Sequence, residues 1–106
     1  MSHRVIFSPR AEAQLVKLHR DIGDRSAPQI GERYTTAIFQ YCLAFSTFPH
    51  RGTRRDDIRP GLRTVGYRRR VTIAFEVTDD AVIILGVYYG GQDYEADLRD
   101  EEASEH

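Results

Sequence analysis

The sequence predicts an α+β fold in the order β-α-α-β-β-β, in which a helical hairpin packs on a mainly antiparallel four-stranded sheet. Two long amphipathic segments follow a short strand-like stretch near the N-terminus, and three further strand-like segments then follow one another across short turns. The 106 residues contain no repeat and no linker, a length that fits one modest core. We therefore expect one domain over residues 1–98, with residues 99–106 forming an acidic, disordered tail.

The N-terminal half predicts a strand and two antiparallel helices. The alternation within residues 4–7 is typical of a short strand. Ser8 is an N-cap candidate followed by proline, and the apolar residues after it recur every three or four positions. A first helix is therefore expected from there to a stop at Gly23. A second helix is expected to start at Ser26, and its apolar stripe extends to Phe48.

The C-terminal half predicts a meander of three strands. Residues 71–77 alternate clearly between apolar and polar side chains, whereas residues 81–89 are apolar on both faces. Because the helical hairpin can cover only one face of the sheet, one alternate set of this last strand is expected to form an exposed apolar patch that a partner covers. The two possible sets are Ile83, Leu85 and Val87, or Val82, Ile84 and Tyr88.

The net charge of −1 conceals two regions of opposite charge. Residues 1–92 carry 14 Lys and Arg against nine Asp and Glu, whereas residues 93–106 carry one Arg against seven acidic residues. Cys42 is the only cysteine, so the sequence offers neither an internal disulfide nor a cysteine metal cluster, and it indicates a reducing cytoplasm. No long apolar run and no signal-like start are present, so we expect neither a membrane span nor secretion.

The densest basic segment lies between the second helix and the next strand. Residues 51–63, RGTRRDDIRPGLR, hold five arginines in thirteen positions. Guanidinium groups pair with carboxylates and phosphates through a planar fork of donors. Such a segment therefore suits an acidic protein partner or a nucleic acid, and a solvated loop is the alternative.

The chain resembles the RelE/ParE superfamily of small bacterial toxins over residues 4–98. The resemblance is carried by FSPRAEAQL at the start of the first helix, by Pro49, Gly52 and Arg54, by RPGLR at residues 59–63, and by YYGGQD at residues 88–93. The last three pieces are more similar to ParE than to RelE. The resemblance implies a RelE/ParE-like fold and the toxin of a type II toxin–antitoxin system, which inhibits growth and stabilises plasmids.

The resemblance also implies the partners. A cognate antitoxin, ParD-like with a ribbon-helix-helix start, would neutralise the toxin and would alone contact operator DNA. ParE-like members act on DNA gyrase, whereas RelE-like members cut messenger RNA in the ribosomal A site, so the shared fold leaves the two targets open. A third possibility is an inactive member that only sequesters the antitoxin and tunes repression of its own operon.

Metal-free RNA cleavage requires a base, an acid and fixed cations around the scissile phosphate. In this chain the side chains nearest to those roles are Arg63, Arg70, Tyr88 and Tyr89. No proton-transfer group is evident, because Lys17 lies in the first helix and no carboxylate is placed to orient His50. We therefore expect a gyrase poison that acts by binding, without metal or cofactor. A metal-independent endoribonuclease that depends on the ribosome is the alternative.

The ParE-like ending and the arginine segment contain the expected binding residues. For target contact these are Arg63, Tyr88, Tyr89, Gln92, Asp93 and Tyr94. For antitoxin contact they are Arg51, Arg54, Arg55, Arg59, Ile83, Leu85 and Val87. The second group combines basic side chains with one of the two candidate apolar sets of the last strand.

Overall fold

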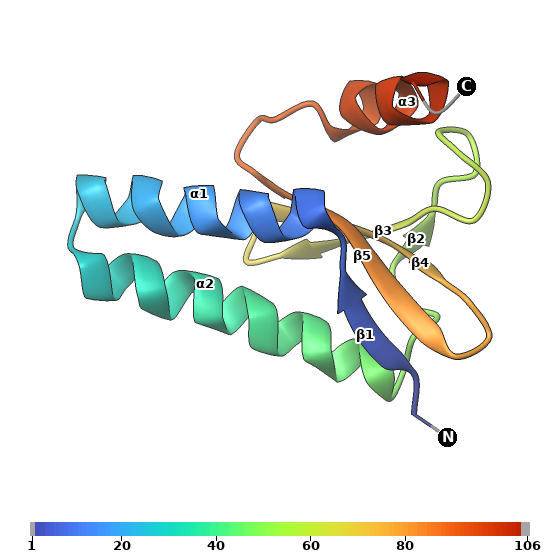
Figure 1. The fold of residues 1–106 in the computed structure, drawn as a ribbon, viewed down its shortest axis with the longest axis horizontal. Helices are drawn as coiled ribbons and strands as arrows, with labels where there is room; N and C mark the ends of the chain where they lie inside the picture. Colours follow the sequence, from blue (N-terminus) through green and yellow to red (C-terminus); the bar gives the residue numbers. More distant parts are fainter. Residues whose placement is uncertain (1, 105–106) are drawn as a thin grey trace.

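The structure of the protein, a computed structural model, describes residues 2–104, with side chains described up to residue 99. Figure 1 shows a helical hairpin, a twisted sheet and a C-terminal helix. In chain order the elements are β1 (Arg4–Phe7), α1 (Pro9–Arg25), α2 (Pro28–Leu43), the 3₁₀ turn η1 (Ala44–Ser46), β2 (Thr53–Arg54), β3 (Arg63–Tyr67), β4 (Val71–Val77), β5 (Ala81–Tyr89) and α3 (Tyr94–Ser104).

The strands form one five-stranded sheet in the order β1-β5-β4-β3-β2. β1 pairs with β5 in parallel, and the other neighbouring strands pair antiparallel. This arrangement confirms the predicted α+β class and the mainly antiparallel sheet. The sequence did not reveal the additional strand, β2, because its two residues are too few to show an alternating pattern.

Helix α1 begins where the sequence predicts, and its first residues are fixed to the sheet. The Ser8 hydroxyl accepts a hydrogen bond from the Ala11 N–H at 3.1 Å and donates one to the Leu85 carbonyl at 3.0 Å. The same side chain therefore caps the helix and ties it to β5.

The turn between the two helices lies further along the chain than the sequence predicts. α1 passes through Gly23 and ends at Arg25, so the predicted stop at Gly23 and the predicted second start at Ser26 are both wrong. The glycines serve close helix packing instead. A Cβ atom on Gly31 of α2 would lie 2.4 Å from the backbone oxygen of His19 and 3.0 Å from the Gly23 nitrogen.

Helix α2 ends earlier than its apolar stripe predicts. It stops at Leu43, and η1 then turns Phe45 fully into the core, whereas Phe48 lies beyond the helix and is 72% exposed. The Arg51 guanidinium closes this end by donating to the carbonyls of Phe48 at 2.8 Å and Ala44 at 3.3 Å.

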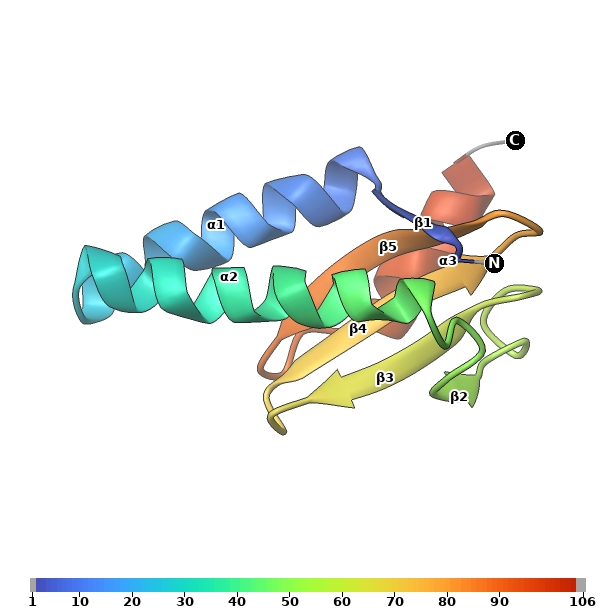
Figure 2. The same cartoon turned by 90° about the horizontal axis from the view of Figure 1, so that it is seen from below.

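The helical hairpin covers one face of the sheet, as Figure 2 shows, and the larger core lies between them. Its buried residues are Ala11, Leu18, Ile22, Ile38, Cys42, Phe45, Val71, Ile73, Phe75, Val82, Ile84 and Val87. Phe45 and Phe75 meet at its centre with ring centroids 4.9 Å apart. Removal of these apolar side chains from water is the main stabilising term for the fold.

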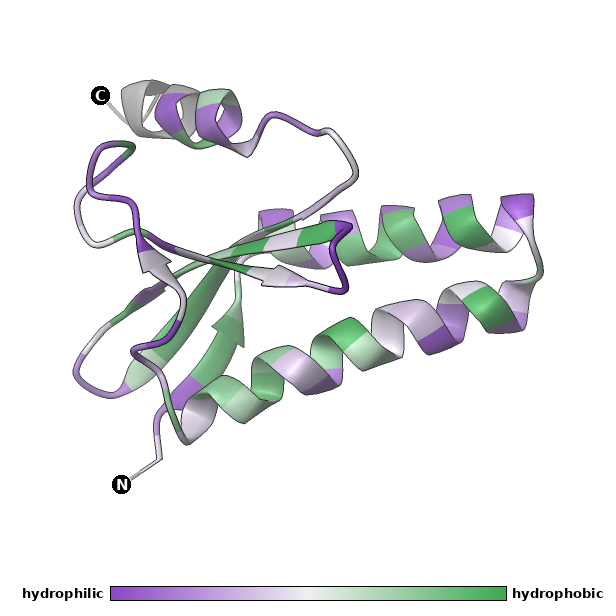
Figure 3. Cartoon of the chain, turned by 180° about the vertical axis from the view of Figure 1, so that it is seen from behind, coloured by the Kyte–Doolittle hydropathy of each residue, from purple (hydrophilic) through white to green (hydrophobic). Residues whose placement is uncertain are grey.

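The opposite face of the sheet is covered by α3 and by the loop between β2 and β3 (Figure 3). The buried residues of this smaller core are Ile58, Leu62, Ala74, Leu85, Tyr88 and Leu98. Among the described side chains of α3, Leu98 is the one that is fully buried in this core. The sheet therefore lies between two layers within the described part of the chain.

Strand β5 contains a β-bulge that the sequence did not reveal. Ala74 of β4 pairs with Gly86, and the next residue, Phe75, pairs with Ile84. Leu85 is therefore an extra residue on β5, and the alternation of side chains between the two faces changes phase there.

The expected exposed apolar patch on β5 is wrong, because both faces of that strand are covered. Its residues divide between the cores, with Val82, Ile84 and Val87 in the hairpin core and Ile83, Leu85 and Tyr88 in the α3 core. Leu85 is 9% exposed and Val87 is 3% exposed. Neither predicted set forms one face of the sheet.

Helix α3 crosses the domain boundary predicted between residues 98 and 99. The helix continues to Ser104, and its core side chain, Leu98, lies at that boundary. The division into a domain over residues 1–98 and a disordered tail over residues 99–106 stays a prediction. Residues 105–106 lie outside the described residues.

Candidate functional site

Two groups of polar side chains contact β5 from opposite faces near its end. The first, called here the α3 contact network, consists of Arg10, Arg55, Asp57, Tyr88, Tyr94, Glu95 and Asp97. The second, called here the basic end, consists of Arg25, Arg33, Tyr34, Tyr67, Arg68, Arg69, Arg70 and Tyr89.

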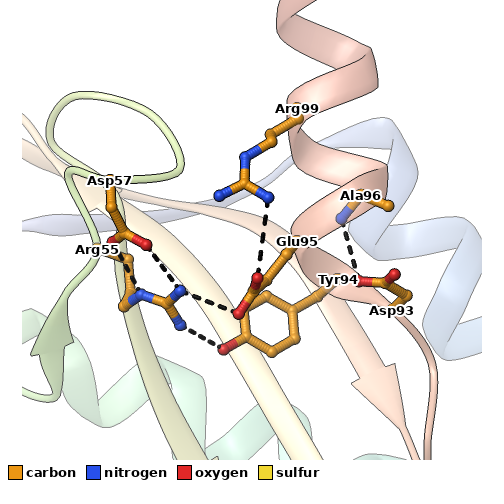
Figure 4. A network of polar contacts seen from close by, with 7 residues as sticks. All are labelled: Arg55, Asp57, Asp93, Tyr94, Glu95, Ala96 and Arg99. Atoms are coloured by element: carbon orange, nitrogen blue, oxygen red, sulfur yellow. Dashed lines mark hydrogen bonds and ion pairs between the residues drawn. The ribbon is translucent and has the colours of Figure 1, made fainter.

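Arg55 is the centre of the α3 contact network (Figure 4). Its guanidinium donates to both carboxylate oxygens of Asp57 at 3.0 and 2.9 Å, to Glu95 at 2.9 Å and to the Tyr94 hydroxyl at 2.8 Å. The hydrogen bonds from Arg55 lower the pKa of the Asp57 carboxyl below its usual value. An arginine that the sequence assigned to antitoxin contact is thus paired within the chain.

Tyr88 and Asp97 form the second half of this network. The Tyr88 hydroxyl donates to Asp97 at 2.6 Å, and Arg10 binds the same carboxylate oxygen at 3.0 Å. Burial, followed by the hydrogen bond to Asp97, raises the pKa of Tyr88 to about 12. The ring lies over Gly86, where a Cβ atom would come within 2.5 Å of it.

The other arginines of residues 51–63 bind different partners. The Arg54 guanidinium forms an ion pair with Asp56 at 3.0 Å, and that of Arg63 donates to the Arg51 carbonyl at 3.2 Å. Arg51 also stacks on the ring of Phe45 with its guanidinium carbon 4.6 Å from the centroid. Arg59 is half-buried in the same loop. Arg54 and Arg63 are also cross-strand partners, so Arg51, Arg54 and Arg63 lie near one another, whereas Arg55 belongs to the α3 contact network.

The four residues of the nuclease alternative do not converge on one site. Arg63 pairs with Phe75 and lies on the hairpin face, whereas Tyr88 lies on the α3 face. Tyr89 pairs with Val71 and Arg70 lies in the turn after β3, so both are at the other end of that strand from Arg63.

The segment assigned to target contact forms the junction between β5 and α3. The Gln92 side chain accepts a hydrogen bond from the Tyr89 N–H at 2.7 Å, and Asp93 accepts one from the Ala96 N–H at 3.1 Å. Tyr94 belongs to the Arg55 network. These side chains shape the chain ending, and their contact with a target stays a prediction.

The basic end is formed by the far parts of α1 and α2, by the turn between β3 and β4 and by the end of β5. Tyr34 and Tyr89 meet edge to face with centroids 5.9 Å apart, and the Arg25 guanidinium carbon lies 5.9 Å from the Tyr89 centroid. Arg33, Tyr34 and Arg68 line an adjoining shallow pocket. Residues 68–70 are a run of arginines in the sequence, and only the fold places them beside the helices.

The side chains of the basic end affect the pKa of the Tyr34 phenol. Its partial burial raises the pKa of the phenol, as does the neighbouring Tyr89, whereas Arg68 and Arg70 act in the opposite direction. The hydroxyl is therefore protonated at neutral pH and can donate a hydrogen bond to an anion.

Within the described residues no group of three or more His, Cys, Asp and Glu side chains is arranged to hold a metal ion. In the same part of the chain, no helix has the length and apolarity needed to cross a membrane.

Comparison with known proteins identifies the family. The family model described as ParE toxin of type II toxin-antitoxin system, parDE, matches residues 5–94. Toxin ParE3 of Caulobacter vibrioides is 26% identical over 95 residues, which cover 90% of this chain and 94% of that relative. A chain in the structure of the chromosomal ParDE TA system from P. aeruginosa superposes with a TM-score of 0.74 at 18% identity, over 84% of this chain and 97% of that one. The chain therefore belongs to the ParE family of toxins of type II toxin–antitoxin systems.

Proposed function

We propose that this ParE-family toxin inhibits DNA gyrase by binding to it and that a cognate ParD-like antitoxin, with a ribbon-helix-helix start, neutralises the toxin. The family match supports the toxin class, and the solved ParDE structure supports an antitoxin partner. The proposal places the protein in the bacterial cytoplasm, where gyrase acts. Operator DNA in the complex would be recognised by the antitoxin.

The observation that carries the binding mechanism is the separation of the residues needed for RNA cleavage. A general base must lie within hydrogen-bonding reach of the proton that it removes and must be partly unprotonated at the working pH. Tyr88 has a pKa of about 12 and already donates to Asp97, so only about one molecule in 100,000 carries its phenolate at pH 7. Arg63, on the opposite face, cannot stabilise the same phosphate.

Antitoxin contact would use the arginine segment where it is accessible. Arg54 lies on the edge strand β2 with its side chain 68% exposed, so an acidic antitoxin side chain could replace Asp56 there. An acidic antitoxin side chain could bind Arg55 only by displacing Asp57 or Glu95. The apolar residues Leu85 and Val87 would become accessible only if one of the covering layers moved.

The test is a supercoiling assay with purified gyrase and purified toxin. The proposal expects loss of supercoiling and accumulation of cleaved DNA attached to gyrase, both reversed by the antitoxin encoded in the neighbouring gene. Normal supercoiling at a large excess of toxin, with no trapped cleavage, would contradict it. The same toxin in a translation extract tests the endoribonuclease alternative: A-site cutting that disappears in Arg63→Ala would establish that activity instead.

Expression without the antitoxin distinguishes both activities from an inactive member. A gyrase poison and an endoribonuclease each stop growth, and only the former raises the amount of cleaved chromosomal DNA. Unchanged growth at a verified level of soluble toxin would show that the protein serves only to bind its antitoxin.

A further inference from the structure

We infer that the basic end binds the phosphate backbone of duplex DNA directly. The inference concerns Arg25, Arg33, Arg68, Arg69 and Arg70, with the tyrosines between them. None of these arginines lies in the 51–63 segment. The choice of duplex DNA rests on the proposed function, because gyrase holds duplex DNA.

Within the part of the chain that the structure describes, the arginines of this end form no direct ion pairs, although Asp21 and Asp24 line a pocket with Arg25. Elsewhere in the described chain, Arg4, Arg10, Arg54, Arg55 and Arg99 each form an ion pair with a carboxylate. No such pair is formed among the described residues by the five arginines of the basic end. Arg25 donates only to the backbone carbonyl of Asp21 at 3.2 Å, and the Asp21 carboxylate is bound to Lys17 at 2.7 Å.

All five of these arginines are exposed, and they come from separate segments of the chain. Arg25 ends α1, Arg33 lies in the second turn of α2, and residues 68–70 form the turn between β3 and β4. Tyr34 joins them, because it lines one shallow pocket with Arg25 and Tyr89 and another with Arg33 and Arg68. The cations therefore form one continuous surface rather than a run along the sequence.

The turn between β3 and β4 has an unusual backbone conformation. Arg68 and Arg69 have φ values of +50° and +64°, a left-handed region that glycine and asparagine occupy more readily than arginine. Positions of positive φ in hairpin loops are usually occupied by Gly, Asn or Asp. Arginine at both positions makes the turn less favourable and presents two guanidinium groups at its tip, a pattern that is typical of a functional constraint.

The form of this surface favours phosphates of a duplex over other anionic partners. β3 and β4 pair with each other up to Tyr67 and Val71, so the turn offers side chains and no free strand edge for an acidic peptide. Tyr34 packs edge to face on Tyr89, and Tyr67 packs on Tyr41, so these half-buried rings do not offer free faces for stacking of unpaired bases. Exposed guanidinium groups around phenol hydroxyls match the phosphate oxygens of a duplex.

The measurement is the fluorescence anisotropy of a labelled duplex of unrelated sequence, titrated with the toxin alone at several salt concentrations. Each phosphate contact contributes about −0.9 to the slope of log K against log salt concentration. The double variant Arg68→Asn, Arg69→Gly removes two charges and places residues that tolerate positive φ at both positions, so the fold should persist. We expect its slope to be shallower by about 1.8 and its affinity in 0.1 M salt to fall roughly 60-fold.

The matched control is Arg4→Thr, Arg99→Gln, which changes the net charge equally at the opposite end of β5 and on α3. We expect it to bind DNA within about threefold of the unaltered toxin. Absence of duplex binding by the toxin would overturn the inference, as would equal losses in the two double variants. Tighter binding to single-stranded RNA or to polyglutamate than to the duplex would also overturn it and would identify the other occupant.

The gyrase assay separates this inference from the proposed function. If the toxin inhibits gyrase but does not bind DNA, only the DNA contact is refuted. If it binds DNA through the basic end but leaves gyrase active, the proposed function is refuted and the DNA contact stands. If both hold, Arg68→Asn, Arg69→Gly should weaken inhibition, whereas the control should not.

Discussion

Leu98 is the fully buried side chain by which α3 packs on the sheet, beside the partly buried Tyr94, and replacement of Leu98 by alanine is expected to release that helix. The residue is 0% exposed and packs in the smaller core with Leu62 and Leu85. Leu98→Ala removes three buried carbon atoms, about 2.4 kcal/mol at 0.8 kcal/mol each, and the residual cavity raises the cost to about 3 kcal/mol. The partly exposed ion pairs Arg10–Asp97 and Arg55–Glu95 each contribute only about 0–1 kcal/mol.

Hydrogen exchange of the α3 backbone amides measures this release. A loss of about 3 kcal/mol corresponds to a decrease in protection of roughly 100-fold, while the strands keep more of theirs. Arg99→Ala is the control on the same helix, because the exposed Arg99 only reaches Glu95 at 3.8 Å, and a change below about 0.5 kcal/mol is expected. Unchanged α3 protection in Leu98→Ala would refute the reasoning that burial of this leucine holds the helix.

Three further predictions concern helix packing and buried groups. Gly31→Ala should lower the free energy of unfolding by about 1–3 kcal/mol in urea denaturation, since its Cβ would lie 2.4 Å from a backbone oxygen. Gly23→Ala, where the nearest atom is 3.4 Å away, should be neutral or stabilising by up to about 1 kcal/mol, and equal losses in both would contradict the close crossing. Because folding raises the pKa of Tyr88 from 10.0 to about 12, its contribution to stability is fully present below pH 10 and is lost as the pH rises to 12. Tyr88→Phe should remove that part of the pH dependence, and an unchanged pH profile would show that the phenol is not held by burial and Asp97. Burial raises the pKa of Cys42 from 9.0 to about 12, so the fraction of the side chain present as thiolate at pH 8 falls about a thousandfold. Alkylation of Cys42 should therefore be slow until denaturant unfolds the chain. Rapid labelling of the native protein would contradict the burial of this thiol.

The order of elements could be predicted because each long segment had a clear period and recognisable ends. Ser8 caps α1 as expected, and residues 71–77 form the strand that their alternation indicates. The errors arose where tertiary packing determines the local structure. Gly23 resembles a helix stop in sequence, whereas its actual role depends on how closely α2 approaches, which no local pattern encodes.

The β5 bulge explains why the apolar surface was predicted wrongly. Alternation along a strand predicts which face of the sheet each side chain takes only while the pairing register is regular. The register between β4 and β5 shifts at Leu85. A strand that is apolar on both sides also has two possible explanations, a missing partner or a second covering layer from the same chain. Here α3 is the second layer, and its polar composition, with Leu98 as its buried residue, gave little sign of it.

The arginines could be counted from the sequence, but their partners could not. Arg55 binds Glu95 and Tyr94, which are about forty positions away in the chain, and that contact follows from the fold. The basic end shows the converse case, because Arg25 and Arg33 lie apart in sequence from residues 68–70 and meet only when the hairpin packs on the sheet. Charge density in sequence therefore does not show which arginines have carboxylate partners in the fold.

Titration of the toxin against a fixed amount of gyrase decides between binding and chemistry. If the toxin acts by binding, supercoiling falls in proportion to the toxin added until every gyrase complex is occupied, and cleaved DNA accumulates to the same limit. The toxin remains bound to gyrase when the complex is isolated. Gyrase that stays active at saturating toxin, together with messenger RNA cut by trace amounts of the same preparation, would contradict this mechanism.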